Sequence, residues 1–408
     1  MQQKLDDAPL AFETSDPEFR RNPYPRYAEL RESDVLHRTP DGLWVLTRYD
    51  DVQAVVRDAR LSSHPKHATD GRANRGGAGL PIVGDGTIEI MLLADPPDHT
   101  RLRRLANKAF TPRAVEQLRP RVQELVDGIL DTAVERGTFD VMADLAEPLP
   151  VMVICDLLGV PVEDQDQFKP WSTAIARMLD PDVDESMLNE AIPAVLGFVN
   201  YFNALIEERR TTPRDDLLSA LIAAEEAGDS LSPGELFAMI ILLFIAGHET
   251  TTNLIGNGTL ALLRNRPQLQ ALTGDPSLAV PGTEELLRYD SPVQVTARTA
   301  TQDLVVNGWL TLQHGESVVC GLAAANRDPR YVDEPESVQL ARGRNSHLSF
   351  SNGMHYCLGA PLARLEGQVA FASMATRFPS MTLLDDTPPY RDHFVLRGLA
   401  SLPIALAG

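Results

Sequence analysis

The sequence is poor in lysine and in cysteine, and it has no excess of positive charge. Four residues are lysines, so arginine supplies nearly all of the 37 basic side chains. Acidic residues number 57, and the formal net charge is -20. This charge disfavours nonspecific binding to nucleic acid or to an anionic membrane, although it allows a local basic face.

The chain also lacks a long apolar run, a linker and an internal repeat. Its longest apolar run, Leu236 to Gly247, is shorter than the ~20 residues that cross a bilayer, so we expect a buried helix there. Met1 to Asp16 is polar and acidic and resembles no secretory signal, which predicts a cytoplasmic protein without a membrane segment. No linker or repeat divides residues 1–408, and we therefore expect a single domain.

The three cysteines, Cys155, Cys320 and Cys357, are an odd number without metal-ligand spacing. This argues against a disulfide framework and against a zinc site. A lone cysteine is usually a small buried hydrophobe, and we read Cys155 and Cys320 in this way. Cys357 differs, because a glycine, a histidine and an aromatic residue precede it and an apolar helical pattern, Ala360 to Phe378, follows.

Most of the chain has the 3.6-residue apolar period of helices. Short β-type segments, such as Leu43 to Thr47 and Asp303 to Val306, are a minority. The sequence thus predicts a mainly α (α+β) fold. Ser62 to Gly86 is rich in glycine and has no helical period, which predicts a functional loop.

The clearest helix begins after Ser232, which with Glu235 forms a capping box around Pro233. The apolar period then continues to about Arg264. At its midpoint Gly247, Glu249 and Thr250 interrupt an apolar stretch, although such residues are poor helix formers. A crossing helix at the glycine is one explanation. The acid beside a hydroxyl favours a proton route at a functional site.

Cys357 is expected at the N-terminus of a helix, where unpaired amides and the helix dipole stabilise negative charge. This position predicts a lowered thiol pKa and a sulfur that accepts N–H groups. A cysteine nucleophile with a histidine base is an alternative. His355 is close in sequence, but nothing marks it as that base.

The surroundings of Cys357 resemble the haem-ligand loop of the cytochrome P450 family, Phe-x-x-Gly-x-His/Arg-x-Cys-x-Gly. The five matching positions are Phe350, Gly353, His355, Cys357 and Gly359. Ser351 stands where a glycine is common, which affects the flexibility of the loop. The helix midpoint is similar to the family's oxygen-activation motif through Ala246, Gly247, Glu249, Thr250 and Thr251, and Glu285 and Arg288 match its Glu-x-x-Arg pair.

The resemblance implies a cytochrome P450 fold, a triangular, helix-rich single domain with a smaller β-rich region. Haem then lies between the long central helix and the helix that follows the cysteine. The implied parts are a substrate-access loop region at 62–94, lid helices at 167–210, the central oxygen-activation helix at 232–264, and the haem-ligand loop with its helix at 345–378.

The resemblance also implies haem b (iron protoporphyrin IX) as cofactor and O2 as co-substrate. Cys357 would be the axial iron ligand, whose thiolate pushes electron density toward cleavage of the O–O bond. Glu249 and Thr250 would be catalytic. The cofactor-binding residues would be His99, Arg103, Ala246, Arg298, Phe350, His355 and Gly359, of which the two histidines and two arginines bind propionates. Glu285, Arg288 and Arg342 would form a structural trio, near which Val338 replaces the usual phenylalanine.

The function implied is a haem-dependent monooxygenase that hydroxylates or epoxidises a hydrophobic small molecule in secondary metabolism or catabolism. Electrons would come from NAD(P)H through ferredoxin reductase and ferredoxin. Arg101, Arg104 and Lys108 could form the surface on which ferredoxin docks. We expect a monomer. The substrate pocket would be lined by Met91, Leu92, Leu93, Leu243, Ala246, Val293, Leu396 and Leu399.

Two other classes of function stay open at this point. A haem-binding sensor or carrier would share Cys357 and the propionate residues but would have no need for Glu249 and Thr250. A non-haem cysteine hydrolase would be colourless.

Overall fold

The computed structural model describes residues 12–406, with gaps at 13, 15, 34–35, 39–43, 70–89, 181–182 and 227–230. Most of the segment from Ser62 to Gly86, predicted to be a loop, lies outside the described residues. Of the expected access region at 62–94, the described parts are 62–69 and 90–94.

Helices account for most of the described chain. The α-helices are α1 (Pro17–Arg21), α2 (Tyr24–Ser33), α3 (Tyr49–Arg57), α4 (Asp98–Ala109), α5 (Pro112–Glu116), α6 (Arg119–Arg136), α7 (Pro148–Leu158), α8 (Phe168–Ala176), α9 (Glu185–Thr211), α10 (Leu217–Glu226), α11 (Pro233–Arg264), α12 (Arg266–Gly274), α13 (Ala279–Tyr289), α14 (Leu322–Ala325) and α15 (Ala360–Arg377). Short helical turns are η1 (Pro65–His67), η3 (Val141–Ala146), η4 (Val162–Gln167), η5 (Arg177–Leu179), η6 (Pro276–Leu278) and η7 (Gly353–His355).

The strands are short, and the larger sheet mixes parallel and antiparallel pairs. They are β1 (His37–Arg38), β2 (Trp44–Leu46), β3 (Leu61–Ser62), β4 (Phe139–Asp140), β5 (Val295–Ala300), β6 (Leu304–Val306), β7 (Leu310–Leu312), β8 (Ser317–Gly321), β9 (Thr382–Leu383) and β10 (Pro403–Ala405). Among the described residues the largest sheet has the order β1-β2-β8-β5-β3. β2 and β8 are parallel, and its other pairs are antiparallel. β2 and β6 confirm the two segments predicted as β-structure.

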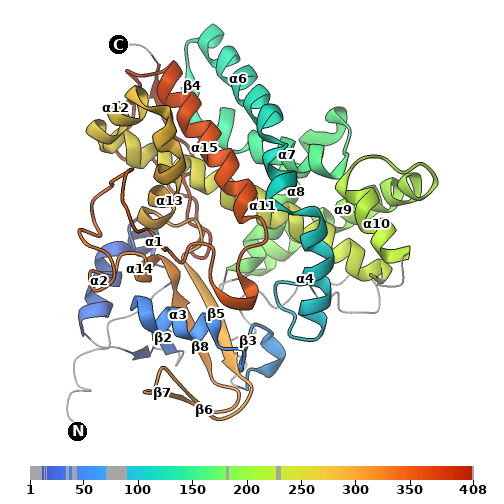
Figure 1. The fold of residues 1–408 in the computed structure, drawn as a ribbon, viewed down its shortest axis with the longest axis vertical. Coiled ribbons are helices and arrows are strands. Elements are labelled where there is room, and N and C mark those ends of the chain that lie inside the picture. The colour runs from blue at the N-terminus through green and yellow to red at the C-terminus, as the bar shows by residue number, and fades with distance from the viewer. Residues whose placement is uncertain are drawn as a thin grey trace.

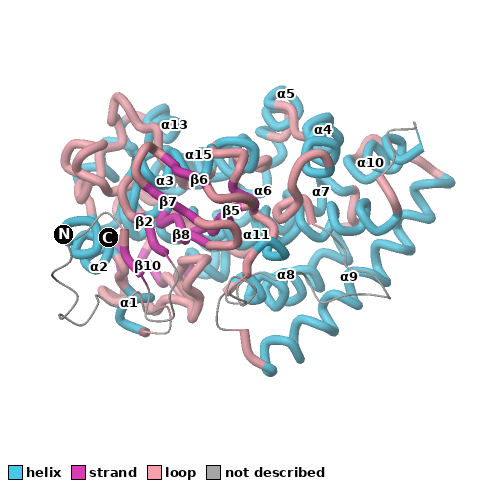
Figure 2. The backbone as a smooth tube through the Cα atoms, turned by 90° about the horizontal axis from the view of Figure 1, so that it is seen from below, coloured by secondary structure: helices cyan, strands magenta, loops and turns pink. Residues whose placement is uncertain are grey.

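The strands of this sheet gather on one side of the molecule, and α8, α9 and α10 lie on the other (Figures 1 and 2). α11 runs between these regions, and α15 crosses in front of it in Figure 1. α11 packs against α7, α8, α13 and α15. The arrangement confirms the predicted mainly α fold with a smaller β-rich region.

α11 begins as the sequence predicts. The Ser232 hydroxyl accepts the Glu235 N–H at 3.3 Å, and the Glu235 carboxylate accepts the Ser232 N–H at 2.7 Å. The helix then continues for 32 residues to Arg264. By length and composition α11 could span a membrane, although the apolar run from Leu236 to Gly247 alone is too short to do so. In this structure 83% of the most apolar window of α11 is buried inside the protein. α11 is therefore the buried core helix predicted.

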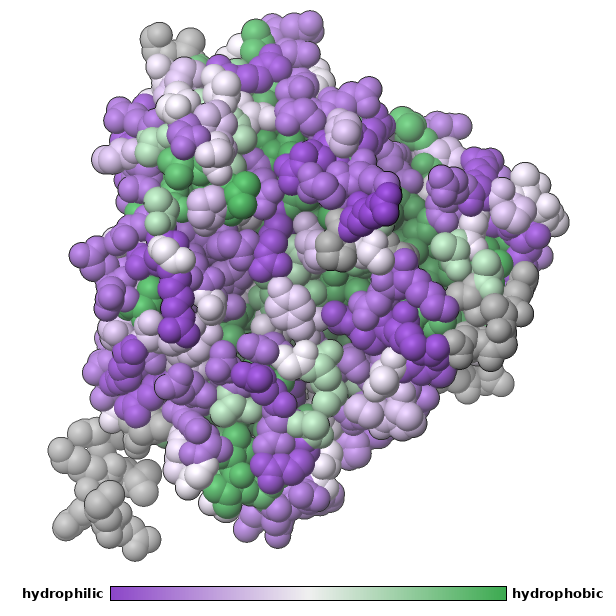
Figure 3. All heavy atoms as spheres, in the orientation of Figure 1, coloured by the Kyte–Doolittle hydropathy of each residue, from purple (hydrophilic) through white to green (hydrophobic). Residues whose placement is uncertain are grey.

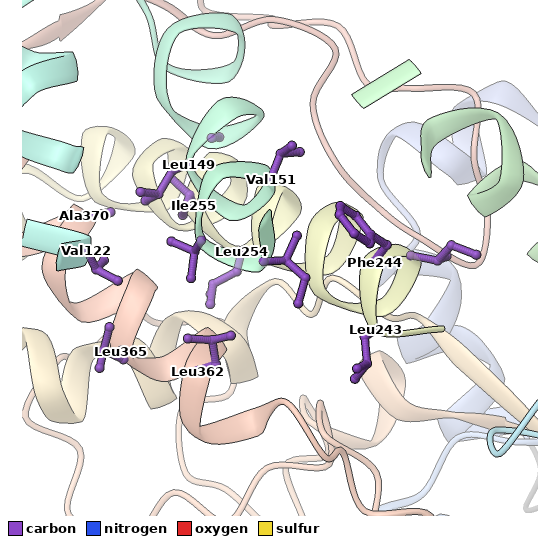
Figure 4. Close-up of a cluster of buried hydrophobic side chains, with 14 of the residues drawn as sticks. Val122, Leu149, Val151, Leu243, Phe244, Leu254, Ile255, Leu362, Leu365 and Ala370 are labelled. Atoms are coloured by element: carbon purple, nitrogen blue, oxygen red, sulfur yellow. The ribbon is translucent and has the colours of Figure 1, made fainter. Parts of the chain in front are cut away.

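α11 and α15 are fixed to one another by the main hydrophobic core, in which α6 and α7 also take part (Figure 4). Val122, Leu149, Leu254, Ile255 and Leu365 are each at most 2% exposed. Full burial of one such side chain stabilises the fold by roughly 1.5–3 kcal/mol. This packing holds the helix that carries Thr250 and the helix that follows Cys357 at a set separation.

Candidate active site

Cys357 lies in the loop between η7 and α15, and backbone groups surround its sulfur. Its own N–H donates to the carbonyl of Phe350 at 2.9 Å. The N–H groups of Gly359 and Ala360, at the start of α15, donate to the sulfur. The expected position at a helix N-terminus and the expected N–H donors to the sulfur are thus both present.

The predicted lowering of the thiol pKa is wrong in its net direction. Burial raises the pKa of Cys357 above its usual value, and the two N–H donors with the charges of Arg103 and Arg364 lower it by less. No histidine hydrogen-bonds the sulfur among the described residues, which leaves the cysteine hydrolase alternative without its base. Cys155 and Cys320 are fully buried, as predicted for packing cysteines.

Two residues give this loop its path. Gly353 has φ 71°, and a Cβ there would lie 2.8 Å from the carbonyl oxygen of Val56, so the turn requires glycine. Ser351 also has positive φ, 59°, and its buried hydroxyl has no hydrogen-bond partner. The glycine that is common at this position suits its left-handed backbone, so the substitution affects local strain rather than flexibility alone.

The four residues predicted to bind propionates come together from α4, β5 and η7. The rings of His99 and His355 have centroids 4.4 Å apart. Burial and the charges of Arg298, His99 and Arg103 lower the pKa of His355 to about 3. Burial also lowers the pKa of Arg103 and of Arg298.

No ion pair joins these four residues to an acid within the described part of the chain. Arg298 donates to the Thr296 hydroxyl at 3.1 Å and to the Ala297 carbonyl at 2.7 Å, and buried Nε2 of His355 has no partner. Two arginine charges withdrawn from water are unfavourable unless an anion joins them, and the two histidines, whose pKa values are lowered, supply neutral N–H groups beside them. Figure 3 shows apolar atoms in the hollow between α4 and α15 on an otherwise mainly polar face. An apolar molecule with two carboxylates fits these surroundings, and haem b is such a molecule.

Asp95 stands behind the cationic group. Its carboxylate accepts a hydrogen bond from the Ser62 hydroxyl and lies 3.3 Å from Nε2 of His67. α4 begins at Asp98, and its N-cap has no side-chain hydrogen bond. Asp95 thus ties α4 to β3 and η1.

One face of α11 stays accessible at the middle of the helix. Leu243, Ala246, Gly247 and Thr250 follow the i, i+3, i+4, i+7 spacing of one face. Ala246 is exposed and Gly247 and Thr250 are half-buried, while most of the helix is buried. A Cβ on Gly247 would meet one atom within 4 Å, Cδ1 of Ile154 at 3.9 Å, so no crossing helix requires this glycine. In Figure 4 Leu243 points to the opposite side of α11 from Phe244.

The two catalytic candidates have separate partners. The Thr250 hydroxyl donates to the Ala246 carbonyl at 2.6 Å. The Glu249 carboxylate, 2% exposed, accepts from the Thr173 hydroxyl at 2.7 Å and pairs with Arg391 at 2.5 Å. Burial raises the pKa of Glu249, but His248, Arg391 and the Thr173 hydrogen bond outweigh it, so the net pKa is lowered. Glu249 is therefore ionised at neutral pH.

Polar contacts join this part of α11 to α8 and to the C-terminal segment. The Ser172 hydroxyl lies 2.6 Å from Nδ1 of His248, whose buried Nε2 has no partner. Arg391 also pairs with Glu147 at 2.5 Å, and Glu147 pairs with Lys169 of α8. Arg391 carries no signal of this role in the sequence, because it is 142 residues from Glu249 and no motif connects the two.

The Glu-x-x-Arg trio is assembled and buried. Glu285 accepts from Nε and Nη2 of Arg288, both at 2.9 Å, and from Nε of Arg342 at 3.0 Å. Arg288 also donates to the carbonyls of Asn326, Pro335 and Ser337. These bonds tie α13 to the segment ahead of the cysteine loop, in which Val338 is buried.

The predicted pocket residues differ in accessibility. Leu92 and Ala246 are exposed, and Leu93 and Val293 are half-buried. Met91, Leu243 and Leu396 retain 4–8% exposure, and Val293 and Leu396 face one another in an antiparallel bridge. Leu399 is 0% exposed, so it offers no surface to a ligand.

The three basic residues of α4 that were expected to dock ferredoxin also differ in their surroundings. Arg104 and Lys108 are exposed on α4. Arg101 pairs with Glu235 at the start of α11 and lies 3.8 Å from Asp98. Arg101 thus joins α4 to α11.

Known proteins share both the sequence and this architecture. The chain is 43% identical to vitamin D(3) 25-hydroxylase of Pseudonocardia autotrophica, over 95% of this chain and 94% of that protein. It is 39% identical to 6-deoxyerythronolide B hydroxylase of Saccharopolyspora erythraea, over 94% and 96%. The solved structure of cytochrome P450 PksS of the Bacillus subtilis bacillaene polyketide synthase matches with a TM-score of 0.87 at 39% identity, covering 97% of this chain and all of that one.

The cytochrome P450 family profile matches residues 44–273 and 283–404 of this chain. The chain therefore belongs to the cytochrome P450 family and is a cytochrome P450 monooxygenase, an enzyme of the class that binds haem b and uses O2.

Proposed function

We propose that this monooxygenase hydroxylates or epoxidises a hydrophobic small molecule of secondary metabolism. Electrons would reach it from NAD(P)H through ferredoxin reductase and ferredoxin, and the protein would act as a monomer in the cytoplasm. The observation that carries the proposal is the group formed by His99, Arg103, Arg298 and His355 near Cys357. His99 and Arg298 are buried, Arg103 and His355 are half-buried, and none of the four forms an ion pair with an acid in the described part of the chain. Charge-assisted hydrogen bonds to two propionates would satisfy this group.

In this proposal Cys357 would hold the haem iron through its sulfur, and the N–H groups of Gly359 and Ala360 would restrain the electron density that the sulfur donates. Bound haem supplies the iron that activates dioxygen. Phe350 holds the cysteine by accepting its N–H, and the ring of Phe350 lies under the guanidinium of Arg364 at 4.5 Å. Ala246, exposed and without a bulky side chain, would contact the haem. The trio of Glu285, Arg288 and Arg342 would be structural.

Thr250 and Glu249 would have different roles in proton transfer. The Thr250 hydroxyl donates to Ala246 and must turn from it to donate toward dioxygen. Glu249 is ionised and paired, so it accepts a proton from solvent before it can pass one on, and Arg391 sets how readily it does so. Glu249 would thus relay protons, and its ion pair with Arg391 would oppose its protonation.

The substrate would be mainly apolar and comparable in size to those for which the relatives are named, vitamin D(3) and 6-deoxyerythronolide B. The apolar lining at Leu93, Leu243, Val293 and Leu396 supports this class. A panel of polyketides, macrolides, sterols and fatty acids, screened by the spin-state shift of the ferric protein, would identify members that displace water from the iron.

Thr250→Ala tests the monooxygenase proposal. With ferredoxin, its reductase and a substrate from that screen, the variant should consume NAD(P)H and release hydrogen peroxide while product formation falls at least tenfold. Thr259→Ala is a matched control, because Thr259 is also on α11 and its hydroxyl also donates to the carbonyl four residues earlier. Unchanged product formation in Thr250→Ala would contradict the role assigned, and absence of turnover in the unmodified protein would favour a sensor or carrier.

Electron delivery is tested at α4. Arg104→Glu and Lys108→Glu should weaken coupling to an acidic ferredoxin, and the loss should decrease at high salt. Arg26→Glu in α2, away from α4 in Figure 1, is the control. Equal coupling in all three variants would place the donor elsewhere.

A further inference from the structure

Asp180 is a buried carboxylate that joins the end of α8 to a distant part of the chain. It follows η5 directly and is 2% exposed. Its Oδ1 accepts the N–H groups of Phe394 and Val395 at 3.2 and 2.9 Å, and its Oδ2 lies 2.9 Å from Nδ1 of His393. A carboxylate with three such partners is a strong anchor, because hydrogen bonds to a charged acceptor are about twice as strong as neutral ones.

The residues that Asp180 holds belong to the segment 389–397, here called the C-terminal turn. On its other side this turn is held by the segment after α13. The Gln294 N–H donates to the Val395 carbonyl at 2.9 Å, and the Arg397 N–H donates to the Pro292 carbonyl at 2.8 Å. Leu396, between these bonds, forms the bridge with Val293. The turn is thus held on one side by a β-type contact and on the α8 side by Asp180. Ion pairs of Arg391, Asp392 and Arg397 with other segments also hold it.

The same elements meet again at the oxygen-activation segment of α11. Thr173 of α8 donates to Glu249, and Arg391 of the C-terminal turn pairs with that carboxylate. α8, α11 and the turn therefore form a closed set of polar contacts. A movement of α8 away from the turn breaks the Asp180 bonds and also disturbs Glu249.

We propose that Asp180 is a positioning residue that latches α8 onto the C-terminal turn and so sets the rate at which substrate enters and leaves the pocket. The inference rests on the proposed function, in which Leu396 of this turn lines the pocket, and on the resemblance, which implies that α8 belongs to the lid helices. When the latch opens, the N–H groups of Phe394 and Val395 lose their acceptor, which makes the open form rare. Without the carboxylate the open form becomes more populated and exchange of the ligand becomes faster.

The test uses the haem-loaded full chain with Asp180→Ala and His393→Leu, and 4-phenylimidazole as the probe, since its ring nitrogen ligates iron. Stopped-flow absorption should show both the association and the dissociation rate constants raised, by about tenfold in Asp180→Ala, because charge-assisted bonds close the latch. The dissociation constant should change by less than about threefold, since a latch affects entry and exit alike. Asp180→Asn, which keeps an acceptor for the two amides, should lie between Asp180→Ala and the unmodified protein.

Glu190→Gln is the matched control. Arg177 of η5 is close to Asp180 in sequence and pairs with Glu190 of α9 at 3.0 Å. The Glu190 side chain is 54% exposed and forms no hydrogen bond or ion pair with the turn in the described part of the chain. Its rate constants should equal those of the unmodified protein.

Hydrogen exchange of the amides of Phe394 and Val395 gives a second readout, which does not depend on a ligand binding in the pocket. Exchange should be faster in Asp180→Ala and unchanged in Glu190→Gln. Unchanged exchange and unchanged rate constants in Asp180→Ala would overturn the proposal. A weakened dissociation constant with an unchanged association rate would also overturn it, since that result indicates general damage. If Asp180→Ala fails to fold, His393→Leu and Asp180→Asn decide. Failure of the proposed function would appear instead as a haem spectrum without thiolate ligation, whatever the exchange result.

Discussion

Removal of the Arg391 side chain as an ion-pair partner should leave Glu249 as a buried, unpaired carboxylate. Glu249 is 3% and Arg391 15% exposed at the side chain, and they lie 2.5 Å apart. Breaking a buried pair from one side costs roughly 3–5 kcal/mol. Because Arg391 is not fully buried, we expect Arg391→Met to lower the free energy of unfolding by about 3 kcal/mol, the low end of that range. For a chain of this length that corresponds to a fall in Tm of roughly 3–6 °C.

The pH dependence of this loss has a definite sign. In the unmodified protein the pKa of Glu249 is lowered, so the pair's contribution is present above the unfolded pKa and is lost as pH falls through the folded value. Without Arg391, one cause that lowers the pKa of Glu249 is lost, so this pKa rises relative to the unmodified protein. The added cost of the charged carboxylate is then present at neutral pH and is relieved on acidification. The difference in stability between the two proteins should therefore narrow on acidification and continue to narrow below about 4.3, the usual pKa of glutamate, toward the lowered folded pKa of the unmodified protein.

Urea and thermal unfolding of the haem-loaded protein at several pH values provide the assay. Arg177→Met is the control, since its partner Glu190 is mostly exposed and such pairs contribute about 0–1 kcal/mol. Glu249→Gln combined with Arg391→Met should recover part of the loss, as coupled neighbours do. Equal stability of Arg391→Met and the unmodified protein at pH 7, or a difference independent of pH, would refute the reasoning.

Three further changes have expected outcomes. Ser351→Gly should raise the free energy of unfolding by about 1 kcal/mol in urea titration, because it removes a left-handed serine and an orphaned hydroxyl. Gly353→Ala should lower it by about 2 kcal/mol and speed haem loss to apomyoglobin, because the Cβ would meet the Val56 carbonyl. Glu366 is buried without a partner for Oε2, and burial raises its pKa to about 8. The folded state holds this proton where the unfolded chain does not, so stability falls as pH rises from about 4.3 to 8, and Glu366→Gln should flatten that slope; an unchanged slope would contradict this.

Local signals predicted much of this molecule. The capping box at Ser232 and Glu235 set the start of α11, and the break at Gly247, Glu249 and Thr250 located the accessible part of that helix. The start of α15 after Cys357 followed from the apolar helical pattern that begins at Ala360. Each of these features depends on neighbours within a few residues, which a sequence displays directly.

Contacts between distant segments could not be predicted in this way. The pairing of Glu249 with Arg391 and the anchoring of the C-terminal turn by Asp180 join residues with no shared pattern. The thiol pKa of Cys357 was assigned the wrong direction because its dominant cause is burial, which depends on the whole fold. Arg101 was predicted to belong to a surface docking patch, but it pairs with Glu235, which is distant in sequence.

The visible spectrum of the reduced protein under carbon monoxide tests the central claim most directly, because it reports on the axial ligand itself. The unmodified, haem-loaded protein should show the strongly red-shifted band of thiolate-ligated haem, and Cys357→His should lose that band while Cys155→Ser and Cys320→Ser keep it. Absence of the band in folded, haem-loaded protein, or its persistence in Cys357→His, would contradict the assignment of Cys357 as the iron ligand.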